Sequence, residues 1–345
     1  MPLAGAWRSD IAFTNIALQD TAFESPEATG RHRESGENHG VNYDIIGDVH
    51  GHHDRLVALL KTLGYRETMR AWRHPGRTAV FVGDFIDRGP KQVETLKLVR
   101  GMVDTGAALA ILGNHELNAI SWATRDPEHR REYLRRHDRP GNREQHKAFL
   151  DEVAGKPLHA EIVDWFRTLP LWLDLGGIRI VHACWNDDHM DALRPHLGKG
   201  ATLTDELIVL ANRRGHRAFE AVETLCKGIE VPLPQGMSFT DRDGKTRTKA
   251  RIRWWEQEPR TYRKVALAPQ AVLKRIPDVP MPPDPRIRPY AGPPVFFGHY
   301  CLTSRPAPLA PRMACVDYNV GDGGELVAYR WHGEPELRAT HFIWV

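Results

Sequence analysis

Short apolar runs recur in the first third of the chain, and polar or glycine-containing segments end each of them. Three runs, at residues 43–46, 78–82 and 109–112, are dominated by β-branched or aliphatic side chains and predict short buried strands. Between them, leucines and valines recur at helical spacing over residues 56–63 and 93–103, which predicts two helices with one apolar face. The alternation of strand and helix predicts an α/β fold.

Side chains that can bind metal ions follow five predicted strands, because two further strands are expected downstream at residues 178–181 and 295–298. Ligand sites of α/β sheets lie at the carboxyl ends of strands, where loops leave the sheet. A single histidine after a strand is more often structural than metal-binding, but five such strand ends favour a shared site. We expect six side chains to converge there: Asp48, His50, Asp84, Asn114, His182 and His299.

Carboxylate, amide and imidazole ligands in this arrangement predict two divalent metal ions. Asp84 is expected to bridge them, with Asp48 and His50 completing the first site and the other three ligands the second. A bridging carboxylate holds two ions about 3.5–4 Å apart, so that both polarise one phosphoryl group and convert a shared water into the attacking hydroxide. Mixed oxygen and nitrogen ligands favour manganese, with iron, zinc, cobalt or nickel as alternatives.

Neighbouring side chains provide the remaining parts of a phosphoryl-transfer site. His115 is expected to protonate the leaving oxygen, with Asp87 fixing its tautomer. Arg88 can hold two phosphate oxygens with its planar guanidinium, and Asn114 is expected to contact substrate as well as metal. The alternative is that Asp87 and Arg88 form a local surface ion pair and that His115 only begins a helix.

Five motifs occur in order along the chain: GDVHG at 47–51, GDFIDRG at 83–89, GNHE at 113–116, VH at 181–182 and GH at 298–299. This set resembles the calcineurin-like metallophosphoesterases, in the branch that contains serine/threonine phosphoprotein phosphatases and bacterial diadenosine tetraphosphate hydrolases. The resemblance implies a four-layer αββα fold, in which a two-sheet β-sandwich is flanked by helices and carries helical and hairpin insertions. It also implies a dinuclear metal site and hydrolysis of phosphate esters or anhydrides. The chain departs from the phosphoprotein phosphatases after His182, where Ala183-Cys184-Trp185 replaces their usual Gly-Gly.

The motif positions predict one catalytic domain over residues 41–345, after a partly disordered leader at residues 1–40. Two insertions are expected within it, at about residues 120–165 and 200–290. Residues 125–147 of the first contain eight basic residues, which form either a basic rim over the metals or a solvated face whose charges pair locally. The second is predicted to contain a helix, a hairpin and a proline-rich connector, at residues 203–226, 237–255 and 269–294.

Basic residues alternate with other side chains at the end of the predicted hairpin. Arg247, Lys249, Arg251 and Arg253 would share one face of a strand, just before a pair of tryptophans. One interpretation is a phosphate-facing row, with Arg253 binding substrate and the tryptophans stacking a base. The other is an edge strand protected by charge.

Composition agrees with a globular enzyme. The 345 residues are 41% hydrophobic with a net charge of +3, and no apolar run approaches the ~20 residues needed to span a bilayer. Four cysteines without a CxxC pair favour reduced thiols and a cytoplasmic location. We expect no membrane association and no specific nucleic-acid binding.

Three functions are compatible with these features. The first is a serine/threonine-phosphatase-like phosphoesterase that acts on a phosphoprotein or a small ester. The second is a dinucleoside polyphosphate hydrolase, with diadenosine tetraphosphate as substrate and the arginine-rich insertions as phosphate contacts. The third, a non-catalytic metal-binding scaffold, does not explain why His115, Asp87 and Arg88 accompany a complete set of ligands.

Overall fold

Six strands form the larger of two central sheets in the computed structural model, which describes residues 42–240, 244–256 and 260–345. The strand order is β15-β16-β1-β4-β5, and β17 also pairs with β16. Strands β1, β4 and β5 run parallel, whereas β16 is antiparallel to β1. Their bounds are β1 Tyr43–Ile46, β4 Thr78–Phe81, β5 Ala108–Ala110, β15 Asp317–Tyr318, β16 Glu325–Trp331 and β17 Phe342–Trp344.

The second sheet has four strands in the order β14-β13-β7-β6. Strand β13 runs parallel to both of its neighbours, and β6 is antiparallel to β7. The bounds are β6 Trp172–Asp174, β7 Arg179–Val181, β13 Val295–Phe297 and β14 Met313–Cys315. The carboxyl ends of β7 and β13, which precede His182 and His299, therefore lie at the same edge of this sheet.

The two sheets pack face to face. Along β1, Ile45 belongs to an apolar cluster shared by both sheets, whereas Ile46 packs with the helices. Along β13, Phe296 lies in the shared cluster and Phe297 does not. The rings of Phe296 and Tyr329, from β13 and β16, are 5.0 Å apart. Successive strand residues point to opposite faces, so this alternation buries one face of each sheet against the other and confirms the predicted sandwich.

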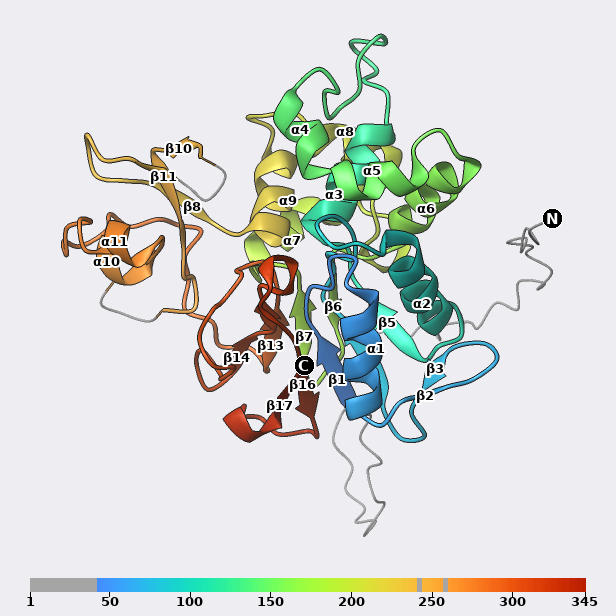
Figure 1. The fold of residues 1–345 in the computed structure, drawn as a ribbon. Coiled ribbons are helices and arrows are strands. Elements are labelled where there is room, and N and C mark those ends of the chain that lie inside the picture. Colours follow the sequence, from blue (N-terminus) through green and yellow to red (C-terminus); the bar gives the residue numbers. More distant parts are fainter. Residues whose placement is uncertain (1–41, 241–243, 257–259) are drawn as a thin grey trace, which may run out of the picture. The chain divides into compact units, whose positions relative to one another are not determined.

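Helices α1 and α2 pack on the outer face of the larger sheet (Figure 1). Helix α1 spans His53–Thr62 and α2 spans Gln92–Asp104, which confirms the two helices predicted from apolar spacing. Leu56 and Leu59 of α1 are fully buried in the same cluster as Ile46. The other α-helices among the described residues are α3 Asn114–Ala123, α4 Pro140–Gln145, α5 Lys147–Val153, α6 Pro157–Arg167, α7 Asp187–Leu193, α8 Asp205–Leu210, α9 Arg217–Lys227, α10 Tyr262–Val265 and α11 Gln270–Leu273.

Some strands end earlier than predicted, because the chain leaves the sheet to form the ligand loops. Strand β4 stops at Phe81, and Asp84 beyond it has a positive φ of 52°, which no strand adopts. Strand β5 ends at Ala110, although the prediction extended to Leu112. The Leu112 N–H donates to Pro170 O at 2.8 Å instead of to a neighbouring strand.

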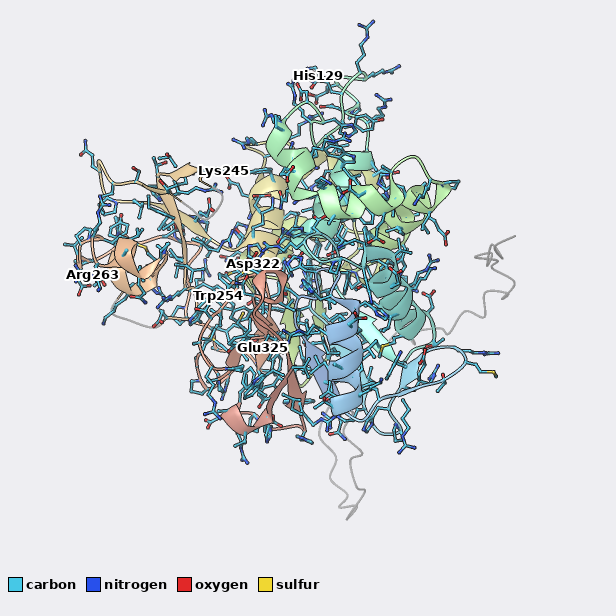
Figure 2. All side chains as sticks on the ribbon, viewed as in Figure 1. His129, Lys245, Trp254, Arg263, Asp322 and Glu325 are labelled. Atoms are coloured by element: carbon cyan, nitrogen blue, oxygen red, sulfur yellow. The ribbon has the colours of Figure 1, made fainter. Side chains whose placement is uncertain are left out.

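The first predicted insertion contains α4, α5 and α6, and Figure 2 shows His129 at its outer tip. Two of its basic residues pair with nearby acids, Arg136 with Glu132 at 3.6 Å and Asp138 at 2.5 Å, and Lys147 with Asp151. Arg135 instead donates to the amide oxygens of Asn118 and Gln145. The insertion is therefore locally paired only in part, and both interpretations of its charges stay open. Arg213 of the second insertion donates two hydrogen bonds to Asp126, at 2.9 and 2.6 Å, and these bonds connect the two insertions.

The second predicted insertion differs most from expectation. The single helix predicted at residues 203–226 is two helices, α8 and α9, because the chain turns at Gly215, where φ is 85°. The predicted hairpin is confirmed as β9 paired with β10, while β11 pairs with β8 and β12. The predicted connector is not wholly extended, since it contains α11 and the fully buried Ile276. The remaining strands are β2 Arg66–Glu67, β3 Trp72–Arg73, β8 Glu230–Pro232, β9 Phe239–Thr240, β10 Thr246–Arg247, β11 Lys249–Ile252 and β12 Ala266–Leu267.

Four short 3₁₀ helices complete the described elements: η1 Arg194–His196, η2 Lys199–Ala201, η3 Val320–Asp322 and η4 Ala339–His341. Among the residues that the structure describes, no helix combines the length and the apolar character that a membrane span requires. The leader predicted at residues 1–40 lies outside the described residues.

Candidate metal centre

All six predicted metal ligands lie at one edge of the sandwich. The larger sheet supplies four of them and the second sheet two: Asp48 and His50 after β1, Asp84 after β4, Asn114 after β5, His182 after β7 and His299 after β13. Possible ligand atoms within 4.8 Å of one another form two groups at this edge, one of His50, Asp84 and His115 and the other of Asp84, His182 and His299, while a third group of Asp126, Glu128 and His129 lies in the first insertion. Asp84 belongs to both groups at this edge, as a bridging carboxylate would.

Two imidazole rings are oriented so that their Nε2 atoms face Asp84. His50 Nδ1 lies 2.8 Å from Ile86 O, and His182 Nδ1 lies 2.7 Å from Val82 O. A ring nitrogen that donates to a carbonyl carries the proton, which leaves the Nε2 lone pair for a metal ion. The Nε2 atoms of His50 and His182 lie 3.7 and 3.3 Å from the carboxylate oxygens of Asp84.

Burial and the charge of Asp84 have opposite effects on these histidines. Burial, together with the neighbouring His115, lowers the pKa of His50 to about 3, so its ring is neutral. Burial also disfavours a charged His182, but the carboxylate of Asp84 outweighs it and raises the pKa of His182 to about 10. A metal ion that binds His182 would therefore have to displace a proton, which makes its affinity pH-dependent.

Asp48 and His299 carry buried polar atoms that no described protein group satisfies. The His299 N–H donates to Asp48 Oδ2 at 3.0 Å, but Asp48 Oδ1 and His299 Nε2 have no partner among the described residues. Burial and the carboxylates of Asp317 and Asp84 raise the pKa of Asp48 well above its usual range. Unsatisfied buried groups are rare in folded proteins. A divalent cation would satisfy both atoms and offset the negative charge, so these side chains fit a metal ion.

Glu116, to which the sequence assigned no role, holds the Asp84 loop in place. Its carboxylate accepts hydrogen bonds from the backbone N–H groups of Asp84 and Phe85, both at 2.8 Å, and of Gly113 at 3.0 Å. Asp84 Oδ1 in turn accepts the His115 N–H at 3.0 Å. Three of these four bonds join the loop after β4 to the start of α3, and the fourth caps the helix. A glutamate at the third position of a predicted helix is the signal that could have indicated this capping role.

The ligand loops have unusual backbone conformations. Five of the predicted site residues have a positive φ between 47° and 71°: His50, Asp84, Asp87, Arg88 and His299. A left-handed conformation at a residue with a side chain costs about 1–3 kcal/mol and persists only where the surrounding structure imposes it. Such strain is typical of active sites and ligand-binding loops.

Two glycines are required by close approaches within these loops. Gly83 has φ 98°, and a Cβ there would lie 2.5 Å from Gly113 N. A Cβ on Gly298 would lie only 1.9 Å from Asp48 Oδ1. A side chain at either position would push a ligand loop away from the cluster.

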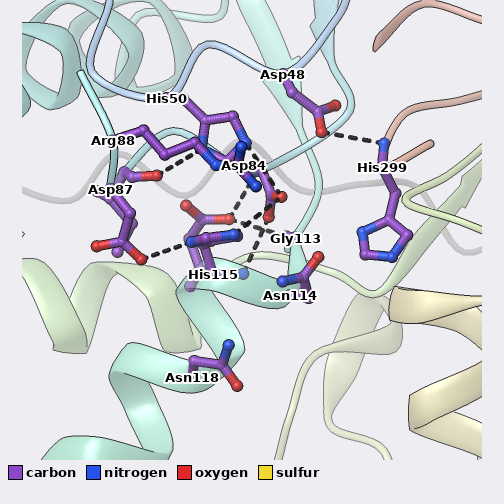
Figure 3. Close-up of polar contacts among 12 residues, drawn as sticks. Asp48, His50, Asp84, Asp87, Arg88, Gly113, Asn114, His115, Asn118 and His299 are labelled. Carbon is purple, nitrogen blue, oxygen red and sulfur yellow. Dashed lines mark hydrogen bonds and ion pairs between the residues drawn. The ribbon is translucent and has the colours of Figure 1, made fainter. Parts of the chain in front are cut away.

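His115 and Asp87 form a buried hydrogen-bonded pair beside the ligand cluster (Figure 3). His115 Nδ1 lies 2.5 Å from Asp87 Oδ2, and His115 Nε2 lies 3.8 Å from Asp84 Oδ2. Burial would raise the pKa of Asp87, but hydrogen bonds from His115 and His146 outweigh it and lower that pKa to about 2. Burial would lower the pKa of His115, but Asp84 and Asp87 outweigh it and raise that pKa. Asp87 is therefore ionised and favours a proton on His115.

Arg88 lies beside the same cluster and contacts the segment after β15. Arg88 Nη1 lies 3.2 Å from Asp322 Oδ2, and a Cβ on Gly321 would lie 2.4 Å from Arg88 Cδ. The side chain of Arg88 is 26% exposed, so its guanidinium is partly open to a ligand. No sequence pattern had indicated Asp322 as its partner.

The basic strand approaches the ligand cluster through Arg251. The Arg251 guanidinium lies 6.0 Å from the ring centre of Tyr300, and its charge adds to burial in lowering the pKa of His299. Among the described residues, no hydrogen bond, ion pair or ring contact joins the Arg253 side chain to the predicted ligands. Alternation along the strand gives both arginines the same face, so the sequence could not distinguish them.

The interpretation in which Trp254 and Trp255 stack a base is wrong, because both side chains belong to the core. They are 5% and 4% exposed, and their rings lie 5.0 and 5.4 Å from that of Phe297. Trp254 Nε1 donates to Ala183 O at 3.0 Å. Figure 2 labels Trp254 where the second insertion meets the rest of the fold. The alternative interpretation of an edge strand is also wrong, because β11 lies between β8 and β12.

Comparisons with known proteins found a family model, curated relatives and solved structures that match this chain. The model of the calcineurin-like phosphoesterase family matches residues 42–268. The asymmetrical bis(5'-nucleosyl)-tetraphosphatase of Halalkalibacterium halodurans is 46% identical over 76 residues, 22% of this chain and 31% of the relative. The symmetrical bis(5'-nucleosyl)-tetraphosphatase of Aromatoleum aromaticum is 34% identical over 139 residues, which are 40% of this chain and 42% of the relative. The crystal structure of a cold-active protein-tyrosine phosphatase of Shewanella sp. matches 90% of this chain and 88% of its own, with 18% identity and a TM-score of 0.46.

The curated relatives share only part of their length with this chain, which spans less than half of each of the two tetraphosphatases. The family model, in contrast, covers five of the ten strands of the sandwich and five of the six predicted ligands, from Asp48 to His182. The match spans more than half of the chain. This protein therefore belongs to the calcineurin-like phosphoesterase family.

Proposed function

We propose that this chain is a metal-dependent phosphoesterase and that its preferred substrates are phosphate monoesters. Membership of the family supports phosphoester hydrolysis, and the two groups of ligand atoms support a metal centre. The observation that carries the substrate class is the 2.5 Å contact between His115 Nδ1 and Asp87 Oδ2. An alkoxide that leaves from a serine-type ester needs a proton, whereas a phosphate that leaves from an anhydride is stable without one. A built-in acid therefore favours esters.

Two divalent ions, with manganese as the first choice, are the proposed cofactor. When bound, they polarise the phosphoryl group and acidify a water molecule. Asp84 would contact both ions, Asp48 and His50 would complete the first site, and the second would take Asn114, His182 and His299. The orphaned atoms of Asp48 and His299 support this assignment.

The remaining side chains would bind the phosphate and handle the proton. Arg88 would hold two phosphate oxygens with its partly exposed guanidinium. Asn114, whose Oδ1 lies 3.1 Å from His182 Nε2, would contact the same phosphoryl group. His115 would donate the proton on Nε2 to the leaving oxygen. Asp87 would keep the other proton on Nδ1, which prevents the ring from flipping.

A dinucleoside polyphosphate is the second candidate substrate. The names of the tetraphosphatase relatives favour it, and so does a cavity of about 130 Å³ beside the loop that follows His182. Tyr290 and Arg286, both partly exposed, line this cavity and offer an aromatic ring and a cation to a nucleotide, whereas Trp185 beside them is 6% exposed and belongs to the core. A stacked base contributes about 1–3 kcal/mol. Tyr290→Leu would then raise KM for diadenosine tetraphosphate roughly 5- to 150-fold and spare p-nitrophenyl phosphate.

Turnover of a phosphoserine peptide, p-nitrophenyl phosphate and diadenosine tetraphosphate, with Mn²⁺ and after chelation, tests the proposal. We expect metal-dependent release of phosphate from the peptide. His115→Asn should lower kcat on the peptide by about 10²–10⁴-fold and on p-nitrophenyl phosphate much less, because nitrophenolate needs no proton to leave.

The exposed His129 provides the matched control, since His129→Asn makes the same substitution at the insertion tip and should leave turnover unchanged. Metal-independent turnover would contradict the proposed cofactor, and equal losses on both esters would remove the acid role of His115. Faster hydrolysis of diadenosine tetraphosphate than of the peptide would make the second candidate the better one.

A further inference from the structure

Asp87 has a second histidine partner, His146, which comes from the first insertion. His146 Nδ1 lies 2.8 Å from Asp87 Oδ1 and 3.1 Å from Oδ2, while His115 Nδ1 lies 2.5 Å from Oδ2. One carboxylate therefore holds two imidazole rings. We propose that His146 is a positioning residue, which fixes Asp87 and, through it, the ring of His115. This inference rests on the proposed function, because it concerns the acid that protonates the leaving group.

His146 is held rigidly at the junction of α4 and α5. Its side chain is 2% exposed, and its ring lies 5.0 Å from that of Phe149 and 6.1 Å from that of Trp122. Trp122 belongs to α3, the helix whose first turn contains His115. The insertion therefore contacts Asp87 through His146, next to the helix that carries His115.

The second bond restricts Asp87 in a way that a single bond would not. A carboxylate with one partner can turn about its Cβ–Cγ bond and still accept through either oxygen, which allows the partner ring to move. His146 Nδ1 lies closer to Oδ1 than to Oδ2, whereas His115 contacts Oδ2, so turning the carboxylate would weaken both contacts. The Asp87 backbone is fixed as well, because its N–H donates to Gln92 Oε1 at 2.7 Å. His115 therefore keeps Nε2 directed at Asp84, 3.8 Å away.

Packing alone does not explain a histidine at this position. His146 Nε2 is buried without a hydrogen-bond partner among the described residues. Such a nitrogen costs stability, and a phenylalanine of similar shape would avoid that cost. The bond from Nδ1 to Asp87 is what a phenylalanine could not provide.

Two substitutions separate the bond from the shape of the ring. His146→Phe keeps a planar ring and loses the donor, whereas His146→Asn places an amide N–H near the position of Nδ1. With Mn²⁺ present, we expect His146→Phe to lower kcat on a phosphoserine peptide about 10- to 150-fold, the value of a hydrogen bond to a charged group. KM and metal content should not change, the loss on p-nitrophenyl phosphate should be smaller, and His146→Asn should recover most of the activity.

The matched control is His159→Phe, which makes the same chemical change on the other side of Phe149. The His159 ring lies 5.7 Å from that of Phe149, and its Nε2 is also buried without a described partner. No hydrogen bond or ion pair joins His159 to Asp87 among the described residues. His159→Phe should therefore not alter the ratio of kcat on the peptide to kcat on p-nitrophenyl phosphate. If circular dichroism shows that His146→Phe does not fold, His146→Gln replaces it, because its amide reaches the position of Nε2 and not that of Nδ1.

A double variant supplies the decisive readout. In the His115→Asn background, His146→Phe should cause no further loss on the peptide, since the ring that it positions is gone. Additive losses, equal losses on both substrates, or no advantage of Asn over Phe at position 146 would overturn the inference. A wild-type protein that hydrolyses neither ester would instead refute the proposed function, so the two failures are distinguishable.

Discussion

Gly298→Ala tests the geometry around Asp48 without removing any functional group. The new Cβ would lie 1.9 Å from Asp48 Oδ1 and 2.9 Å from Val82 Cγ2, whereas ordinary contact begins at 3.4 Å. The carboxylate must therefore move by 3.4 − 1.9 = 1.5 Å. Metal sites tolerate displacements of only about 0.2 Å. We expect the affinity for Mn²⁺ to fall about 10- to 100-fold and the free energy of unfolding to fall by about 1–3 kcal/mol.

Calorimetric titration with Mn²⁺ measures the first effect, and urea unfolding of the chelated protein measures the second. The backbone of Gly298 does not have a positive φ, so alanine can adopt it and the effect comes from the Cβ alone. Gly76→Ala is the matched control, because nothing lies within 4 Å of a Cβ at that exposed position. Unchanged Mn²⁺ affinity and kcat in Gly298→Ala would refute the close packing of Asp48 against the loop after β13.

Three further changes test other contacts. Asp84→Asn removes the carboxylate shared by both ligand groups, so elemental analysis should find less bound metal and turnover should stop; full metal content with full activity would exclude a bridging role. Asp322→Asn removes the carboxylate that lies 3.2 Å from Arg88. Because the guanidinium is then free to bind phosphate, KM for phosphate monoesters should fall up to about fivefold at constant kcat. An unaltered KM would count against Arg88 as the phosphate ligand. Hydrogen bonds from Arg213 lower the pKa of Asp126. Asp126→Asn removes this charged partner, so the free energy of unfolding at pH 7 should fall by about 1–2 kcal/mol. A lowered folded-state pKa gives stability that is present above about pH 3.9 and is lost as the pH falls, so the difference in stability from wild type should vanish in acid. Asp164→Asn is the control, because Asp164 is exposed and has no ion pair among the described residues. A difference that does not change in acid would contradict the ion pair of Asp126.

The strands and the metal-binding edge could be predicted because local pattern and chemistry coincide there. Each buried strand is short and apolar, and the polar residue after it has few reasons to be present other than binding. Ile46 precedes Asp48 by two residues, and Val181 directly precedes His182. Parallel strands then bring such residues to one edge, whatever the length of chain between them.

Contacts that the insertions make with the site could not be predicted in this way. His146 lies 59 residues from Asp87, and Asp322, in the 3₁₀ helix between β15 and β16, lies 234 residues from Arg88. No local pattern distinguishes either from its neighbours. Their positions depend on how the first insertion and the segment after β15 fold back on the site. The predicted single helix at residues 203–226 failed for a related reason, since apolar spacing continues across the turn that divides it.

The two sheets meet through an apolar cluster, yet the ligand edge belongs to both of them. Asp84 comes from one sheet and His299 from the other, with 299 − 84 = 215 positions of chain between them. An ion held by both would act as a reversible cross-link, closing a long loop only while it stays bound. It would add stability in proportion to the logarithm of free metal concentration. A chelator would then weaken the seam between the sheets before it disturbed the strands within either sheet, and metal supply would govern how long the folded chain survives.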